Sequence, residues 1–169
     1  MELLSKGTYL AYSEAEEGTY KKLYGLRSTP DMGGDPEKVE VTNLNDSMRR
    51  YVRGIKDPGD LEFGFYYNSA EENPNATENE VSTSYATLRA LDTAGTSVWY
   101  ILVYPDGTGF KWKGSVSVKR SAAEVNGVLA FTLRTMCETE LTDYTAAQTT
   151  QTTGTEEQTT GTEEQTTGA

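Results

Sequence analysis

Histidine is absent from this chain of 169 residues, and cysteine occurs once, at Cys137. Without histidine there is no Ser-His-Asp or Cys-His catalysis, no histidine-ligated metal and no imidazole to move protons near neutral pH. A lone cysteine excludes an internal disulfide framework and a cysteine-based zinc cluster. Cys137 follows an alternating segment, so we interpret it as a small buried hydrophobe rather than a reactive thiol.

Long apolar runs and catalytic motifs are lacking too. No stretch approaches the roughly 18 consecutive apolar residues of a membrane-spanning helix, and the first residues show neither a basic start nor an apolar run, so neither a membrane segment nor a secretory signal is expected. No phosphate loop, nucleophile elbow or calcium loop occurs. Aspartate pairs around the glycines of residues 31–35 and 57–60 are explained by turns. We therefore expect no enzyme, no catalytic residue, no metal and no cofactor.

Basic residues are outnumbered, with 15 Lys and Arg against 26 Asp and Glu, a formal net charge of −11. Residues 138–169 hold seven acidic and no basic side chains, which leaves residues 1–137 with 15 basic and 19 acidic ones, a net −4. Nucleic-acid wrapping depends on Lys and Arg that displace counterions from phosphate. An acidic chain of this kind is not expected to wrap DNA.

The C-terminal residues differ in composition from the rest. From Gln151 the heptapeptide Gln-Thr-Thr-Gly-Thr-Glu-Glu repeats, and residues 145–169 contain no Val, Ile, Leu, Phe, Trp or Tyr. Such a segment has nothing apolar to offset its ordering entropy, so it is a flexible tail or takes its order from an assembly. We predict one domain over residues 1–144 and a low-complexity tail over residues 145–169.

The sequence of residues 1–144 predicts antiparallel β-structure with one helix. Alternating or apolar strand patterns cover residues 61–67, 97–104, 108–113, 115–119 and 128–135. Turns are expected at 105–107 and 126–127, and the last three strands are predicted to form a meander. A capping box from Thr77 to Glu80 and a helical spacing of apolar residues predict a helix near residues 78–91, with Gly95 as its stop. The expected class is α+β, mainly antiparallel β, a sandwich or barrel with one flanking helix.

Residues 42–60 are longer than a hairpin connection needs. With Lys38 just upstream, they hold five of the fifteen basic residues, the others being Arg49, Arg50, Arg53 and Lys56. Tyr51, Val52 and Ile55 are apolar enough to contact a partner. The segment is therefore either a solvated loop or a loop for assembly or ligand binding.

Two motifs together resemble a known family. Residues 33–42 read Gly-Gly-x-Pro-x-x-Val-x-Val-Thr, and residues 54–63 read Gly-x-Lys-Asp-x-Gly-x-Leu-x-Phe. Over residues 7–135 the chain resembles major tail tube proteins of phages with long non-contractile tails that infect Gram-positive bacteria. The resemblance implies a structural virion protein with the tail tube β-sandwich and a flanking helix. It further implies hexameric rings stacked into a tail, assembled in the host cytoplasm, with tape measure and terminator proteins as partners and viral DNA passing through the tube without sequence-specific binding.

The resemblance assigns ring stacking to the long loop, whose candidate residues are Asn45, Asp46, Arg49, Arg50, Tyr51, Arg53, Ile55 and Lys56. Alternation predicts that Val39, Val41, Leu61, Phe63 and Phe65 face the core. Glu40, Thr42 and Glu62 would then face outward together on two neighbouring strands, either as a channel wall that does not bind phosphate or as an ordinary solvated face. The alternative function is a secreted or surface-displayed β-sandwich that binds carbohydrate or acts as an adhesin.

Overall fold

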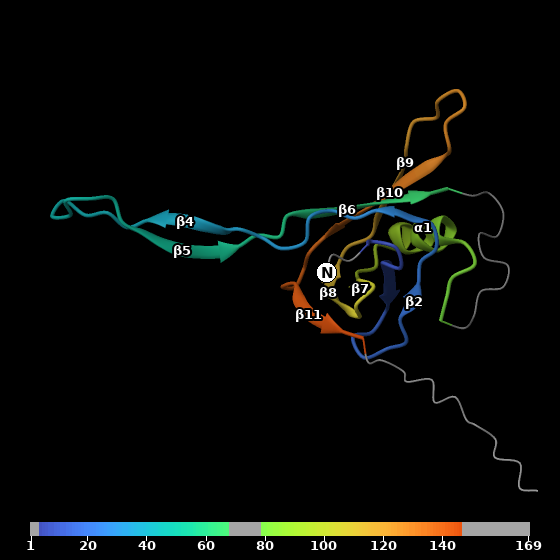
Figure 1. The fold of residues 1–169 in the computed structure, drawn as a ribbon, viewed down its shortest axis with the longest axis horizontal. Helices are drawn as coiled ribbons and strands as arrows, with labels where there is room; N and C mark the ends of the chain where they lie inside the picture. Colours follow the sequence, from blue (N-terminus) through green and yellow to red (C-terminus); the bar gives the residue numbers. More distant parts are fainter. Residues whose placement is uncertain (1–3, 68–78, 147–169) are drawn as a thin grey trace, which may run out of the picture.

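The computed structural model describes residues 4–67 and 79–146, and Figure 1 shows their arrangement. The expected start of the helix at residue 78, the capping residue Thr77 and the tail beyond residue 146 lie outside the described residues. Within the described part, the order of elements is β1 (Tyr9–Ser13), β2 (Lys21–Lys22), β3 (Leu26–Ser28), β4 (Pro36–Glu40), β5 (Tyr51–Lys56), β6 (Asp60–Tyr66), α1 (Ser84–Ala94), β7 (Val98–Val103), β8 (Thr108–Gly114), β9 (Ser117–Arg120), β10 (Ala130–Met136) and β11 (Thr142–Thr145).

A five-stranded antiparallel sheet has the order β11-β8-β7-β1-β2. Its central strand β7 is the run of aromatic and β-branched residues, and it pairs with β8 through the turn at residues 105–107. Gly107 adopts a φ of +82°, a left-handed conformation that suits glycine, and its N–H donates to the Tyr104 carbonyl at 2.9 Å. The predicted strand and turn are therefore confirmed.

A four-stranded antiparallel sheet, β3-β6-β10-β9, faces the first one. Strand β6 directs Leu61, Phe63 and Phe65 into the core, where none exceeds 1% exposure, as its alternation predicts. Strand β10 does the same with Phe131 and Leu133. The core lies between these two sheets.

Aromatic rings join the two sheets across the core. Trp112 of β8 stacks on Phe63 of β6 with ring centroids 5.8 Å apart, and Tyr100 of β7 stacks on Trp112 at 5.4 Å. All three side chains are fully buried. Because burial of each large apolar side chain stabilises the fold by about 1.5–3 kcal/mol, this aromatic column is a major source of stability.

The helix begins later than the sequence predicts. Thr83 is its N-cap, and Glu80 forms a parallel bridge with Lys22, so Glu80 lies before the helix and not in its first turn. Its end is as predicted, because Gly95 adopts a φ of 64° and donates to the Asp92 carbonyl at 3.1 Å. Ser84 fastens the helix to the body, since its hydroxyl donates to the Tyr24 carbonyl at 2.8 Å and accepts the Tyr24 N–H at 2.7 Å.

The predicted meander is wrong. Strands β7 and β8 form one hairpin and β9 and β10 another, but they belong to different sheets, because the chain crosses between them after Gly114. Gly114 forms a bridge with Cys137, so the two sheets meet at this corner. The result is a sandwich-like α+β fold, mainly antiparallel β with one helix, as expected, and the described sheets form no closed barrel.

Among the described strands, β4 and β5 pair only with each other, and they extend far from the sandwich (Figure 1). Residues 36–56, that is β4, β5 and the connection between them, are called the arm below, and residues 41–50 are its tip. Within residues 4–67 and 79–146, no helix is long and apolar enough to span a membrane.

Candidate functional site

The arm exposes large apolar side chains over its whole length. Leu44 is fully exposed, Ile55 is 86% exposed and Met48 is 72% exposed. An isolated two-stranded ribbon is only marginally stable in water, since it has one ladder of hydrogen bonds and no face packed on a core. The arm therefore has the composition of a surface that another molecule covers.

The register of the ladder gives the arm two different faces. Val39 is opposite Val52, and Val41 follows on the same side, so one face is apolar. Lys38 is opposite Arg53, and Glu40 is opposite Tyr51, so the other face carries charged and aromatic groups. A bulge between Pro36 and Lys38 shifts the register near the base. Both faces are open to solvent in the single chain.

Hydrogen bonds among its own residues order the arm tip. The Thr42 hydroxyl accepts the Arg50 N–H at 3.0 Å, and the Val41 N–H donates to the Arg50 carbonyl at 2.9 Å. The Asp46 carboxylate accepts the Asn43 N–H at 3.0 Å and lies 3.5 Å from the Arg50 guanidinium. Because these contacts are local, the tip has a defined shape without help from the sandwich.

The structure places all eight predicted stacking residues on the arm, but it corrects how they are held. The segment from residue 42 to residue 60 was expected to be one long loop; instead Tyr51–Lys56 is strand β5, paired with β4. Tyr51, Arg53, Ile55 and Lys56 lie on that strand, whereas Asn45, Asp46, Arg49 and Arg50 lie at the tip. Arg50 forms an ion pair with Asp46, whereas the other basic residues of the arm form none with the described residues.

The predicted channel face is not a single face. Glu40 and Thr42 belong to the arm, whereas Glu62 lies on β6 between β3 and β10, so the two strands are not neighbours. Val39 and Val41 do not pack on the core either, being 41% and 39% exposed. Alternation correctly indicated a two-faced strand there, but no described residue outside the arm covers its apolar face.

Glu62 itself faces solvent, as predicted, but next to a cation. The Arg134 Nε of β10 lies 3.8 Å from the Glu62 carboxylate, and the Arg134 guanidinium also pairs with Asp60. Lys119 lies on the neighbouring strand β9 of the same sheet. This outer face of the four-stranded sheet therefore mixes charges of both signs.

A hollow of about 340 Å³ lies where the arm joins the sandwich, and it is called the root hollow below. Phe110, Leu141 and Pro58 are its partly exposed apolar lining, and Glu140 and Asp143 are acidic groups at its edge. Its lining residues are Gly33, Gly34, Lys56, Pro58, Phe110, Glu140, Leu141 and Asp143. No motif in the sequence indicates this site; the available signal is the series of acidic residues that begins at Glu138.

The two segments at the base of the arm, around Gly34 and Asp57, pass each other closely. A Cβ atom on Gly34 would lie 2.7 Å from the carbonyl oxygen of Asp57, so only glycine fits at this crossing without displacing backbone. Gly34 thus allows the two segments of the arm to stay close together where they leave the sandwich. The crossing thereby sets one side of the root hollow.

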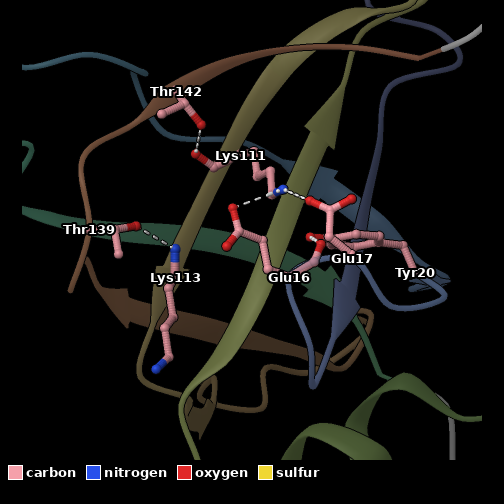
Figure 2. A network of polar contacts seen from close by, with 7 residues as sticks. All are labelled: Glu16, Glu17, Tyr20, Lys111, Lys113, Thr139 and Thr142. Atoms are coloured by element: carbon pink, nitrogen blue, oxygen red, sulfur yellow. Dashed lines mark hydrogen bonds and ion pairs between the residues drawn. The ribbon is translucent and has the colours of Figure 1, made fainter.

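A network of polar contacts holds the opposite side of the root hollow in place (Figure 2). The Thr142 hydroxyl donates to the Lys111 carbonyl at 3.0 Å, and the Thr139 hydroxyl accepts the Lys113 N–H at 2.9 Å. These two threonines flank Glu140 and Leu141, so they fix both residues along β8.

Lys111 also ties residues 14–20 to the outer face of the five-stranded sheet. Its ammonium lies 3.2 Å from the Glu16 carboxylate and 3.4 Å from that of Glu17, and the Tyr20 hydroxyl donates to the Glu16 carbonyl at 2.9 Å (Figure 2). Burial disfavours the charged form of Lys111, but Glu16, Tyr20 and Glu17 together outweigh it and raise the pKa of the amine. This contact holds residues 14–20 against β8.

The one thiol of the chain, Cys137, was considered in the sequence as a possible reactive group. Cys137 is half-buried against the core, and burial together with Asp60 and Asp57 raises the pKa of its thiol. That direction disfavours the reactive thiolate, in line with its interpretation as a small hydrophobe. Residues 4–67 and 79–146 contain no cluster of three metal-ligating side chains.

Sequence comparisons do not assign the chain to a family, because no protein-family model matches it and no curated protein matches it significantly. Structural comparison finds solved structures with a similar fold. The tail of an empty gene transfer agent particle with C6 symmetry has a subunit that is 17% identical, with a TM-score of 0.63 over 86% of this chain and 100% of the other. A subunit of the six-fold symmetrised baseplate of the anti-feeding prophage is 8% identical, with a TM-score of 0.63 over 86% and 97%.

The SPP1 tail tube protein is 10% identical, with a TM-score of 0.52 over 85% of this chain and 80% of the other. At these identities the likeness concerns the fold. The described chain thus has the fold of subunits found in phage tail tubes and related tail particles.

Proposed function

We propose that this protein is the structural subunit of a phage-type tail tube. Copies assemble into hexameric rings, the rings stack into the tube, and the tube conducts viral DNA into the host. The observation that carries this proposal is the exposed arm, which projects from a fold otherwise found in tail subunits. The protein is then a component of the virion tail and acts as a structural protein, not as an enzyme.

The arm supports stacking because it offers many weak contacts that a ring multiplies. An exposed opposite-charge pair stabilises by roughly 0–1 kcal/mol, too little for one contact between two copies. In a ring, the same contact recurs around the circle, and the combined effect is strong. We assign this role to Asn45, Asp46, Arg49, Arg50, Tyr51, Arg53, Ile55 and Lys56, and add Glu40 and Thr42, which lie on the same arm.

The proposed conduit agrees with the charge of the chain. A net charge of −11 gives DNA phosphate little to bind, so DNA passes without sequence-specific contacts. Glu62 is the candidate that remains for the channel wall. Tape measure and terminator proteins are the proposed partners inside and at the end of the tube, and a long non-contractile tail is the proposed setting.

Negative-stain electron microscopy of purified protein over a range of concentrations tests the proposal. We expect rings at low concentration and stacked tubes at high concentration. Size-exclusion chromatography of the same samples separates the alternative, because a carbohydrate-binding module should elute as a monodisperse monomer. Monomers alone at the highest concentration would overturn the tube proposal.

A further inference from the structure

Two exposed surfaces of this chain have apolar side chains and opposite charges. The arm tip presents Leu44 and Met48 to solvent and, beside them, Arg49, which has no ion pair among the described residues. Protruding apolar side chains flanked by an unpaired guanidinium are typical anchors of a protein interface. The tip therefore lacks a partner among residues 4–67 and 79–146.

The root hollow has the opposite character. Phe110, Leu141 and Pro58 give it an apolar lining with room for a long side chain, and Glu140 and Asp143 are carboxylates with no ion pair in the described part of the chain. Lys56 contributes one cation, so the charged lining remains net acidic. The hollow could thus accept an apolar anchor with a neighbouring arginine.

A chain cannot fill its own hollow with its own tip. The arm is a paired ribbon that points away from the sandwich (Figure 1), and about ten residues at about 3.3 Å each place the tip roughly 35 Å from the base. An arm tip that fills this hollow therefore belongs to another copy. A contact between different surfaces of identical chains repeats head to tail and gives an open polymer when it does not close.

We propose that the arm tip of one copy docks in the root hollow of a second copy. Leu44 and Met48 lie against Phe110 and Leu141, and Arg49 pairs with Glu140 and Asp143. This inference rests on the proposed function, because it names the surface that receives the arm in the stacked assembly. It also assigns a role to residues at the C-terminal end of the body, among them Glu140 and Asp143.

Disulfide cross-linking tests the contact, because Cys137→Ala leaves a chain without cysteine. In that background, Met48→Cys and Glu140→Cys are made in separate proteins, mixed in equal amounts, assembled and oxidised. A disulfide forms only when the two Cα atoms come within about 7 Å, so a covalent dimer reports the distance between them. We expect a dimer between the two variants, and none when Met48→Cys is replaced by Val125→Cys, a more exposed site on the β9–β10 connection.

Charge exchange gives a second readout with intact folding. Arg49→Glu should raise the critical concentration for polymerisation about tenfold, because the loss is repeated at every copy of the contact. Combining Arg49→Glu with Glu140→Arg should return the critical concentration most of the way to that of the unmodified protein. Circular dichroism would verify that each variant is folded, since both positions are exposed.

The outcomes separate this inference from the proposed function. Tubes with neither the cross-link nor the charge rescue would overturn the docking assignment and leave the tube function in place. Failure of the unmodified chain to form rings or tubes would overturn the function itself. The specific cross-link together with charge rescue would support both.

Discussion

Val39 is directly opposite Val52 across the β4–β5 ladder, yet the two side chains remain 41% and 48% exposed. A cross-strand pair of β-branched residues stabilises a ladder by a few tenths of a kcal/mol up to about 1 kcal/mol, which does not offset the ordering of an entire arm. Nothing else in the described chain packs over the pair. The apolar face of the arm is thus suited to a contact with another copy.

Changing Arg49, Arg50 and Arg53 together to Glu should leave the fold intact and impair tube growth. All three lie on the arm away from the core, so the free energy of unfolding should change by no more than about 1 kcal/mol. Electron microscopy checks tube growth, and urea denaturation checks stability. The same three positions changed to Lys form the matched control, because they keep the charge and should keep the tubes. Normal tubes from the Glu variant would show that the basic groups of the arm are not needed for stacking.

Local patterns predicted much of the sandwich. Alternation gave the inward faces of β6 and β10, and the positive φ required after a helix pointed to Gly95. Such features depend on neighbours in sequence, which is why they can be read directly. The predicted start of the helix was wrong, because Glu80 forms a β-bridge with Lys22, a contact between distant segments.

Pairing between distant segments was not predictable in the same way. The apolar alternation of Val39 and Val41 looks the same whether the face meets its own core or a second molecule, so Val39 and Val41 were wrongly assigned to the core. The sheet change after Gly114 likewise leaves no mark in local periodicity. The stacking segment was found from its length and charge, whereas the root hollow, with Phe110 and Glu140, exists only after folding.

Phe131→Ala should destabilise the sandwich by about 3–5 kcal/mol. The ring is fully buried, stacks on Phe65 at 5.1 Å and meets Tyr85 edge-on at 5.2 Å, so its removal leaves a cavity between the sheet and the helix. Chemical denaturation measures the loss. Val125→Ala is the control, because Val125 is 94% exposed and its truncation should cost less than about 0.5 kcal/mol. A similar small effect for Phe131→Ala would contradict the core described here.

Truncation after Ala147 should leave the melting temperature unchanged within error, because the repeat has no apolar residue to add to a core. Truncation after Leu141 should lower it by at least about 5 °C. The shorter chain loses β11, including Tyr144, which packs over Ile101 and Val103, and the Ala146 N–H that donates to the Gly107 carbonyl at 2.7 Å. Scanning calorimetry compares the two chains. A large drop after Ala147 would mean that the repeat stabilises the body.

Stability should fall as the pH rises above 10. Burial raises the pKa of Tyr100, and also that of Tyr9, Tyr12, Tyr20 and Tyr104, above the ordinary value of 10. The unfolded chain then loses phenolic protons at a pH at which the folded chain still holds them, so stability is complete below pH 10 and decreases above it. Urea denaturation at several pH values measures the slope. Tyr100→Phe should make the fall shallower, and an unchanged slope would contradict the assignment to Tyr100.

The channel proposal is tested through Glu62, whose surroundings are now defined. Arg134 and Lys119 are two cations on the same sheet. The acidic residues Glu62 and Asp60 offset their charge, and the Glu62 carboxylate lies 3.8 Å from the Arg134 Nε. Glu62→Lys would leave cations facing the DNA, and phosphate should then bind the wall by displacing counterions. We expect phage with this change to build normal tails and to eject DNA more slowly. High salt should restore the rate, because it screens exposed charges and weakens counterion release.

Two further variants make the Glu62 result specific. Glu62→Gln removes the carboxylate without adding a cation, so it should slow ejection less than Glu62→Lys. Glu40→Lys adds the same charge on the arm, which is separate from the four-stranded sheet, so it should affect stacking rather than ejection. An ejection rate that stays the same in correctly assembled Glu62→Lys tails would falsify the placement of Glu62 on the channel wall. Its face of the sheet would then belong to the outside of the tube or to a contact between neighbouring subunits.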